Sequence, residues 1–202
     1  MPEAAATPQS LADRRRRQMM DDLATVAIRL FTDIGFEETS MEDIADEAGV
    51  SRRTVYRHFP TKADLVFEHP RRWLEHFEAV LDSPVEGETP RQRIERAIIE
   101  IGEMIAIDPE PVLEAFAVRN ANPILGATHA ASDQRWAELV FANLLAEHGE
   151  SQMFQCMICA GALVGATNAL ILSWSLAYPD GDFGQMTQAA LAQVDGLWPD
   201  ET

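Results

Sequence analysis

Cysteine is scarce in this chain of 202 residues, which holds only Cys156 and Cys159. Two cysteines do not make a disulfide framework, so a reducing cytoplasm is the expected compartment. The N-terminal stretch carries its arginines after a polar segment and lacks the apolar core of a signal peptide, which agrees with that compartment.

Alternating runs of β-branched residues are also lacking, as are internal repeats and low-complexity segments. Sheet-based and repeat architectures are therefore not expected. Apolar residues instead recur at helical spacing nearly throughout, with breaks at Gly, Pro and Asn. This pattern predicts an all-α fold of about nine helices.

Catalytic signatures are missing as well: the chain has no nucleophile elbow, P-loop, HExxH or dinucleotide fingerprint. We therefore expect no enzyme activity, no cofactor and no metal. The stretch CMIC has the spacing of a redox or metal motif, but it lies in an apolar helical run with no histidine nearby. Two small buried residues one turn apart is the preferred interpretation. A helical redox or enzymatic protein using Cys156 and Cys159 stays open as the alternative, and so does a helical scaffold.

Positive charge is nearly absent from the second part of the chain. Residues 73–202 hold five Arg and no Lys against 20 acids, whereas residues 1–72 hold 11 Lys and Arg against 13 acids. The formal net charge of the whole chain is −17. Any contact with DNA is therefore expected in the N-terminal part only, with the acidic part directed away from phosphate.

One short basic segment, Ser51 to Lys62, contains no acid, and it follows a glycine. Gly35 and Gly49 are placed to end two helices, and Ser51 and Thr61 to begin two others. The fourth helix is expected to run from Thr61 to about Leu81. A short helix, a turn at Gly49 and a second short helix make a helix-turn-helix.

The second of these short helices has two different faces. Val55 and Phe59 lie on its inner face, and the arginines lie on the other side. Arginine pairs with phosphate and bonds guanine in a bidentate manner, so the outer face suits DNA. The candidate DNA-binding residues are Ser40, Arg52, Arg53, Thr54, Tyr56, His58 and Lys62.

The segment LFTDIGFEETSMEDIADEAGVSRRTVYRHFPTKADL, Leu30 to Leu65, resembles the DNA-binding segment of the TetR family of repressors. The resemblance implies base-edge contacts from Arg52, Arg53 and Thr54. It implies contacts with the DNA backbone from Ser40, Tyr56, His58 and Lys62, and leaves the role of Arg57 open. The run Arg14–Arg17 has two open interpretations, an arm that reaches DNA or a solvated charge run.

Residues 152–179 contain no charge and could span a bilayer by length. Polar residues within this segment and the lack of a basic flank favour a dimer interface instead. Gly161, Gly165 and Ala169 form a stripe of small residues that lets another helix approach. An apolar stripe from Phe183 to Leu197 predicts that the last helix joins the same interface between two copies of the chain.

The middle of the chain is rich in aromatic residues and methionine, which line apolar pockets but more often form plain core. In the TetR family this region binds ligand, so the resemblance implies a cavity for a small apolar effector. The chain also loosely resembles the subgroup with acyl-CoA-like ligands. Its scarcity of basic residues argues against such a ligand, because a CoA phosphate needs cations, and favours a neutral or cationic ligand. The candidate ligand-binding residues are Trp73, Phe77, Met104, Phe116, Trp136 and Asn168.

These observations predict three regions: a basic arm at 1–17, a helix-turn-helix DNA-binding domain at 18–65, and a ligand-binding and dimerisation domain at 66–202. The expected protein is a cytoplasmic, homodimeric transcriptional regulator. It would act as a repressor that a small apolar effector releases from a palindromic DNA operator.

Overall fold

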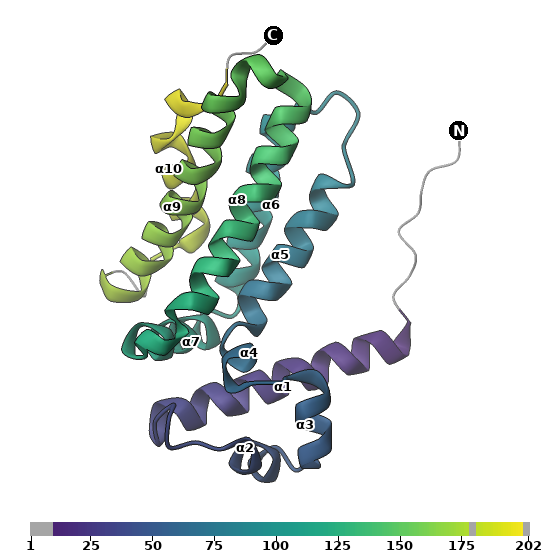
Figure 1. Ribbon diagram of the computed structural model, residues 1–202, viewed down its shortest axis with the longest axis vertical. Coiled ribbons are helices and arrows are strands. Elements are labelled where there is room, and N and C mark those ends of the chain that lie inside the picture. Colours follow the sequence, from purple (N-terminus) through teal and green to yellow (C-terminus); the bar gives the residue numbers. More distant parts are fainter. Residues whose placement is uncertain (1–9, 178–180, 200–202) are drawn as a thin grey trace. The chain divides into compact units, whose positions relative to one another are not determined.

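The computed structural model describes residues 10–177 and 181–199, and the chain divides into two compact units, Met1–Glu68 and His69–Thr202 (Figure 1). The all-α prediction is confirmed, since the described residues form ten α-helices and three short 3-10 helices, and no strand. The division lies close to the boundary expected at residue 65.

The N-terminal unit contains α1 (Leu11–Asp33), α2 (Met41–Glu47), α3 (Arg52–His58) and α4 (Lys62–Val66). Each of these helices begins after a Ser or Thr whose side chain accepts a hydrogen bond from a backbone amide in the first turn. Such caps satisfy amides that have no partner within the helix. The helices enclose a small core, of which the fully buried members are Leu23, Ala24, Ala27, Ile28, Ile44, Ala45, Val55, Phe59 and Leu65.

Two glycines turn the chain between these helices. Gly35 follows α1 with a φ of 117°, and Gly49 lies between α2 and α3 with a φ of 65°. Side chains other than glycine rarely adopt positive φ, which explains why the helices end at these positions, as the sequence predicts.

The arm expected at 1–17 differs from the structure in its last part. Helix α1 already begins at Leu11, with Ser10 and Asp13 forming a reciprocal capping box, so Arg14–Arg17 are helical. The acid at the helix start offsets the unfavourable placement of four cations near the positive end of the helix dipole. Residues 1–9 lie outside the described residues.

The single helix expected between Thr61 and Leu81 is wrong, because the structure divides it into α4 and α5 (Glu68–Leu81), with the break at Phe67. Pro70 supplies the physical reason. A proline has no amide hydrogen to donate to the carbonyl four residues earlier, here that of Val66, and its ring clashes with that carbonyl. The extra helix accounts for the difference between ten helices and the nine expected.

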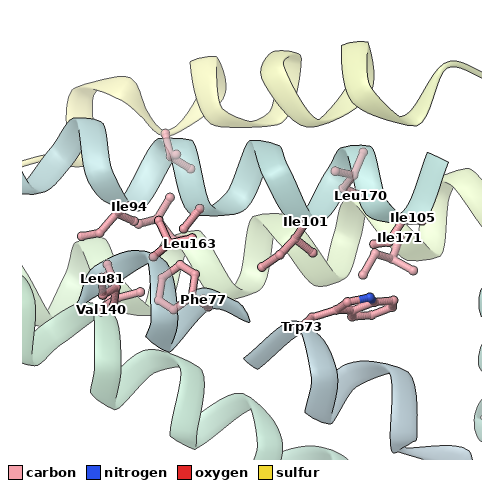
Figure 2. Packing of buried hydrophobic residues seen from close by; sticks show 14 of the residues in the cluster. Trp73, Phe77, Leu81, Ile94, Ile101, Ile105, Val140, Leu163, Leu170 and Ile171 are labelled. Carbon is pink, nitrogen blue, oxygen red and sulfur yellow. The ribbon is translucent and has the colours of Figure 1, made fainter. Parts of the chain in front are cut away.

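The remaining helices of the C-terminal unit are α6 (Pro90–Ile107), α7 (Glu110–Ala121), α8 (Gly126–His148), α9 (Met153–Ala177) and α10 (Phe183–Gln193). Helix α8 packs against α9, and α10 packs against both α6 and α9. Side chains from α5, α6, α8 and α9 meet in one apolar core, where Phe77 and Trp73 face the isoleucines of α6 and the leucines of α9 (Figure 2).

The last helix does not offer the outer apolar stripe that the sequence predicts. Phe183 and Val194 are buried in the core, and Met186, Ala190 and Leu197 pack against it. The reason is the close approach of α10 to α6, where a Cβ atom at Gly102 would lie only 2.7 Å from the hydroxyl of Thr187. The stripe thus covers the core of its own chain, which leaves α9 as the exposed apolar helix.

Candidate nucleic-acid interface and ligand cavity

Helix α3 separates its side chains as its 3.6-residue period requires. Val55 and Phe59 are buried against α2 and the rest of the small core, while Arg52, Arg53 and Tyr56 are exposed. A helix of seven residues anchored by two apolar side chains therefore presents a row of cations and an aromatic ring on one face. Arg57 lies on the exposed side as well.

The two neighbouring arginines have different surroundings. Arg52 forms an ion pair with Glu42 of α2, and its guanidinium lies 5.7 Å from the centre of the Tyr56 ring. Arg53 forms no ion pair or hydrogen bond with another described residue, and it is exposed. Of these two neighbours, Arg53 is therefore the one whose guanidinium is not held by a carboxylate. Thr54 is half-buried, and its hydroxyl lies 2.8 Å from that of Ser51.

Ser40 is already occupied by its helix cap. Its backbone amide and its hydroxyl both donate to the Asp43 carboxylate, at 2.8 and 2.7 Å. These bonds from Ser40 lower the pKa of Asp43, so the carboxylate stays charged. A phosphate at the start of α2 must therefore displace a carboxylate, which weakens the case for Ser40 as a phosphate ligand.

Lys62 also has partners within its own unit. Its ammonium donates to the backbone carbonyl oxygens of Phe36 and Glu37, the latter at 3.2 Å, and lies 4.6 Å from the centre of the Phe36 ring. It fastens the turn after α1 to the start of α4. Nothing in the sequence pattern signals this contact, because it joins residues 26 positions apart.

His58, at the end of α3, lies beside a group of arginines. Burial lowers its pKa first, and the nearby charges of Arg57 and Arg16 lower it further, so the imidazole is neutral at pH 7. Arg16 belongs to the exposed first turns of α1. The basic surface of α3 is thus continued by α1. We call the four residues Arg14–Arg17 the basic extension.

A cavity of about 90 Å³ lies inside the C-terminal unit, between α5, α6, α7, α8, α9 and α10. Five of the six candidate ligand-binding residues line it: Trp73, Phe77, Phe116, Trp136 and Asn168. The rings of Phe77 and Trp136 are in contact, with centroids 4.8 Å apart. Met104 does not line the cavity and packs against the core instead.

Beside the predicted Asn168, three polar residues that the sequence analysis did not place in the cavity gather on one part of its wall. Asn168 donates to the Asp133 carboxylate at 3.0 Å, and the His129 imidazole lies 3.5 Å from the same carboxylate. Arg119 lines the cavity with its guanidinium 3.5 Å from the centre of the Phe116 ring. We call Arg119, His129, Asp133 and Asn168 the polar cluster. The 129/133 spacing of four was the only signal in the sequence.

The two cysteines are buried, and burial raises the pKa of both thiols, that of Cys159 to about 12. A thiol that stays protonated at neutral pH is a poor nucleophile and a poor metal ligand. Among the described residues no group of three or more metal-ligating side chains is found. These observations remove the support for a redox role of Cys156 and Cys159.

Helix α9 exposes an apolar stripe along its whole length. The exposed positions recur at spacings of three and four, which is one face of a helix. The stripe consists of Phe154, Ile158, Gly161, Gly165, Ala169, Leu172 and Leu176, and Met157 beside it is also exposed. The segment Glu150–Ala177 is long and apolar enough to cross a membrane, although core helices of soluble proteins can have the same length and apolar composition.

Comparison with known proteins agrees with these features. The family described as "Bacterial regulatory proteins, tetR family" matches residues 23–68. The HTH-type transcriptional regulator TcmR of Streptomyces glaucescens is 31% identical over 115 residues, 53% of this chain and 51% of TcmR. The HTH-type transcriptional repressor KstR of Mycobacterium tuberculosis is 30% identical over 141 residues, 68% of this chain and 61% of KstR. The chain thus spans about half to three fifths of the length of these two relatives.

Likeness to solved structures extends over both units. The crystal structure of Thermus thermophilus FadR, a TetR family repressor in complex with lauroyl-CoA, has a TM-score of 0.60 and 20% identity. The matched region covers 91% of this chain and 97% of the FadR chain. The relatives named here are all transcriptional regulators, which agrees with the expectation that the chain is not an enzyme. The N-terminal unit therefore carries the helix-turn-helix domain of the TetR family of regulatory proteins, and the chain shares the fold of a TetR family repressor.

Proposed function

We propose that the protein is a homodimeric transcriptional repressor that binds a palindromic DNA operator and is released by a small effector in the cavity of the C-terminal unit. The observation that carries this proposal is the outer face of α3, where cations stand on a helix fixed by its own core. The similarity to KstR, a transcriptional repressor, supports repression as the response.

The surroundings of each residue decide whether we assign it a base contact, a contact with the DNA backbone or a structural role. Arg53 is the base reader, since its donors are not engaged by the described part of the chain. Arg52 and Tyr56 lie beside it and contact the backbone or a second base, and His58 and the basic extension contact phosphates further along. Ser40 and Lys62 serve chiefly to hold the helix-turn-helix in shape.

The exposed stripe of α9 is the proposed dimer interface. A single protomer leaves Phe154 and Leu176 about three quarters exposed, at 76% and 74%. The small residues in the middle of the stripe let a second α9 approach closely, and pairing the two stripes would remove these side chains from water. Two copies of α3 are then held at one spacing, as successive major grooves require.

Effector binding is coupled to DNA binding through a change in the size of the cavity. Sites for drug-sized ligands measure roughly 300–1,000 Å³, and the cavity measures about 90 Å³. A drug-sized effector must therefore push the surrounding helices apart. A conformation with a wider cavity and a different spacing of the two α3 helices would bind effector well and operator poorly.

A calorimetric titration tests this coupling. An operator is first selected from random duplexes, and an effector is found by screening apolar compounds and acyl-CoAs for thermal stabilisation. The effector is then titrated into the protein alone and into its complex with operator. We expect operator to weaken effector binding some 5–150-fold, because the two ligands must affect each other by the same factor. Equal affinities in the two titrations contradict the proposal.

A further inference from the structure

One member of the polar cluster, Arg119, carries a charge that no ion pair neutralises among the described residues. Asp133 has a donor in Asn168 at 3.0 Å and a neighbour in His129 at 3.5 Å. Arg119 has no carboxylate within ion-pair distance among the described residues. Its contacts there are the Phe116 ring and the amide oxygen of Asn120, at 3.4 Å. The acid of the cluster is thus satisfied and the base is not.

Burial makes this imbalance costly. Arg119 is half-buried, and burial lowers its pKa, although the charge of Asp133 acts in the opposite direction. A guanidinium carries five donors in a planar fork, and the described chain accepts only one hydrogen bond from Arg119, at the amide oxygen of Asn120. A half-buried charge that has lost part of its water and gained no counter-ion destabilises the folded protein. An anion in the cavity would remove that cost.

The shape of the rest of the cavity limits what carries the anion. Trp73, Phe77 and Trp136 form an aromatic wall, and aliphatic side chains of α6 and α9 complete it. The volume of about 90 Å³ is less than that of an engineered cavity of about 150 Å³ that binds benzene. A ligand of one ring or a short chain is therefore the size that the cavity can accept with the least movement of the surrounding helices.

From these contacts we infer that the effector is a small monocarboxylate with an apolar body, whose carboxylate pairs with Arg119 and whose body lies against Trp73, Phe77 and Trp136. This inference rests on the proposed function and names the ligand class of the same cavity. Asn168 donates a hydrogen bond to Asp133, so that this carboxylate is already engaged when the ligand carboxylate enters. A carboxylate is favoured over a neutral acceptor because it bonds the guanidinium through two parallel charge-assisted hydrogen bonds.

A structural role for Arg119 is the competing explanation. The residue lies in the last turn of α7, where a cation interacts favourably with the helix dipole, and it stacks on Phe116. Such a role predicts that replacing Arg119 changes stability but not the preference of the cavity for acids over neutral compounds.

The test compares matched probes: phenylacetate with phenylacetamide, and hexanoate with hexanamide. Binding is followed by the fluorescence of the tryptophans in the cavity wall and by calorimetry. We expect each acid to bind about ten-fold or more tightly than its amide, which corresponds to a hydrogen-bonded charge. In Arg119→Gln this preference should disappear while the affinity for the amides stays.

Arg135→Gln is the matched control, because Arg135 lies on α8, outside the cavity, and pairs with Glu78 at 2.8 Å. It should retain the full preference for acids. Acids that bind no better than amides, or do not bind at millimolar concentration, overturn the inference. So does a preference that survives in Arg119→Gln.

Operator binding separates this inference from the proposed function. If the acids bind through Arg119 but leave operator affinity unchanged, the ligand class stands and the regulatory role fails. If the amides bind as tightly as the acids and both release operator, the regulatory role stands and the ligand class fails. Release of operator by the acids alone, lost in Arg119→Gln, supports both.

Discussion

The two units of the chain differ in what they do with their positive charge. The C-terminal unit has seven arginines against 20 acids, and Arg91, Arg96 and Arg135 each hold a carboxylate of the same unit. The N-terminal unit has nine Lys and Arg against 13 acids, and Arg53 and Arg57 have no carboxylate partner among the described residues. Paired arginines stabilise a fold, whereas arginines without a partner are available to another molecule.

The two units also differ in the structural features on which their function depends. In the N-terminal unit it depends on which side chains stand on the outer face of one short helix. In the C-terminal unit it depends on the space that buried side chains leave between six helices and on an exposed stripe without any charge. Substitutions in one unit should therefore alter DNA contacts directly, and those in the other should alter them only through assembly or effector binding.

The largest expected effect comes from a change in the C-terminal unit. Gly165→Leu places a large side chain in the middle of the α9 stripe, where nothing in the same protomer lies within 4 Å of an added Cβ atom. Removing a glycine from a helix also favours the folded protomer by roughly 0.5–1 kcal/mol. We expect dissociation of the dimer, seen by light scattering. Operator affinity should then fall about 100-fold or more, because one half-site is engaged at a time.

Ala192→Leu is the control for this variant, because Ala192 is exposed on α10, whose apolar stripe faces the core. It should leave both the dimer and operator affinity unchanged. A Gly165→Leu protein that remains dimeric and binds operator normally would show that α9 is not the interface.

The second effect tests the base contact in the N-terminal unit. Arg53→Ala removes an exposed guanidinium without a partner among the described residues, and should cost about 1–3 kcal/mol of operator binding and relax specificity at one operator position. Arg52→Ala should cost less, since Arg52 must leave Glu42 before it reaches DNA. The measurement is a titration of operator variants changed at single positions.

Arg29→Ala serves as the control within the same unit, because Arg29 is exposed on α1 and already paired with Glu47 of α2, and it should leave operator binding unchanged. Equal weakening of all operator variants by Arg53→Ala would assign Arg53 to the DNA backbone instead.

The sequence predicted most helix starts and turns of the N-terminal unit, because local chemistry determines them. Caps at Ser40, Ser51 and Thr61 and turns at Gly35 and Gly49 each depend on a single residue and its neighbours. What escaped prediction there is long-range or steric: the contact of Lys62 with the carbonyl oxygens after α1, and the break that Pro70 imposes before α5.

The C-terminal unit was predicted less well for a physical reason. An apolar stripe at helical spacing shows that a helix buries one face, but not against which partner. The stripe of α10 was thus assigned to a second protomer when it packs on its own core, and Met104 was placed in a cavity that it does not line. The polar cluster joins α7, α8 and α9, and apart from the spacing of 129 and 133 no local pattern brings these residues together.

The third effect concerns stability of the C-terminal unit alone. Glu88 is largely buried between α5 and α6, where Arg96 donates two hydrogen bonds to it, at 2.6 and 3.0 Å, and the Val85 amide a third. The bonds from Arg96, aided by that amide, lower its pKa to about 2 from the ordinary 4.5. Glu88→Gln loses the charge-assisted pair, which should cost about 1–2 kcal/mol at neutral pH.

The pH dependence of this loss has a definite sign. Because the pKa of Glu88 is lower in the folded than in the unfolded chain, its contribution is complete above about 4.5 and is lost as the pH falls towards 2. Wild type and Glu88→Gln should therefore converge in acid. The exposed Glu86 offers the control, Glu86→Gln, with unchanged unfolding. A constant difference at all pH values would show that shape, not charge, is what the substitution removes.

The smallest effect compares one arginine from each unit directly. Arg16 belongs to the basic extension, is exposed, and acts on His58 at the end of α3. If it contacts a phosphate, Arg16→Ala removes one counterion-releasing contact per protomer, and the salt dependence of operator binding should become shallower. Each lost phosphate contact changes the slope of log affinity against log salt by about 0.9.

Arg135→Ala removes the same charge from the C-terminal unit, where Glu78 already neutralises it, and should leave the slope unchanged. The measurement is operator affinity at several salt concentrations for the three proteins. All operator sequences should be affected alike by Arg16→Ala, since phosphates carry no sequence information. Equal slopes for Arg16→Ala and wild type would make the extension a solvated charge run, and the DNA-binding surface would then end at α3.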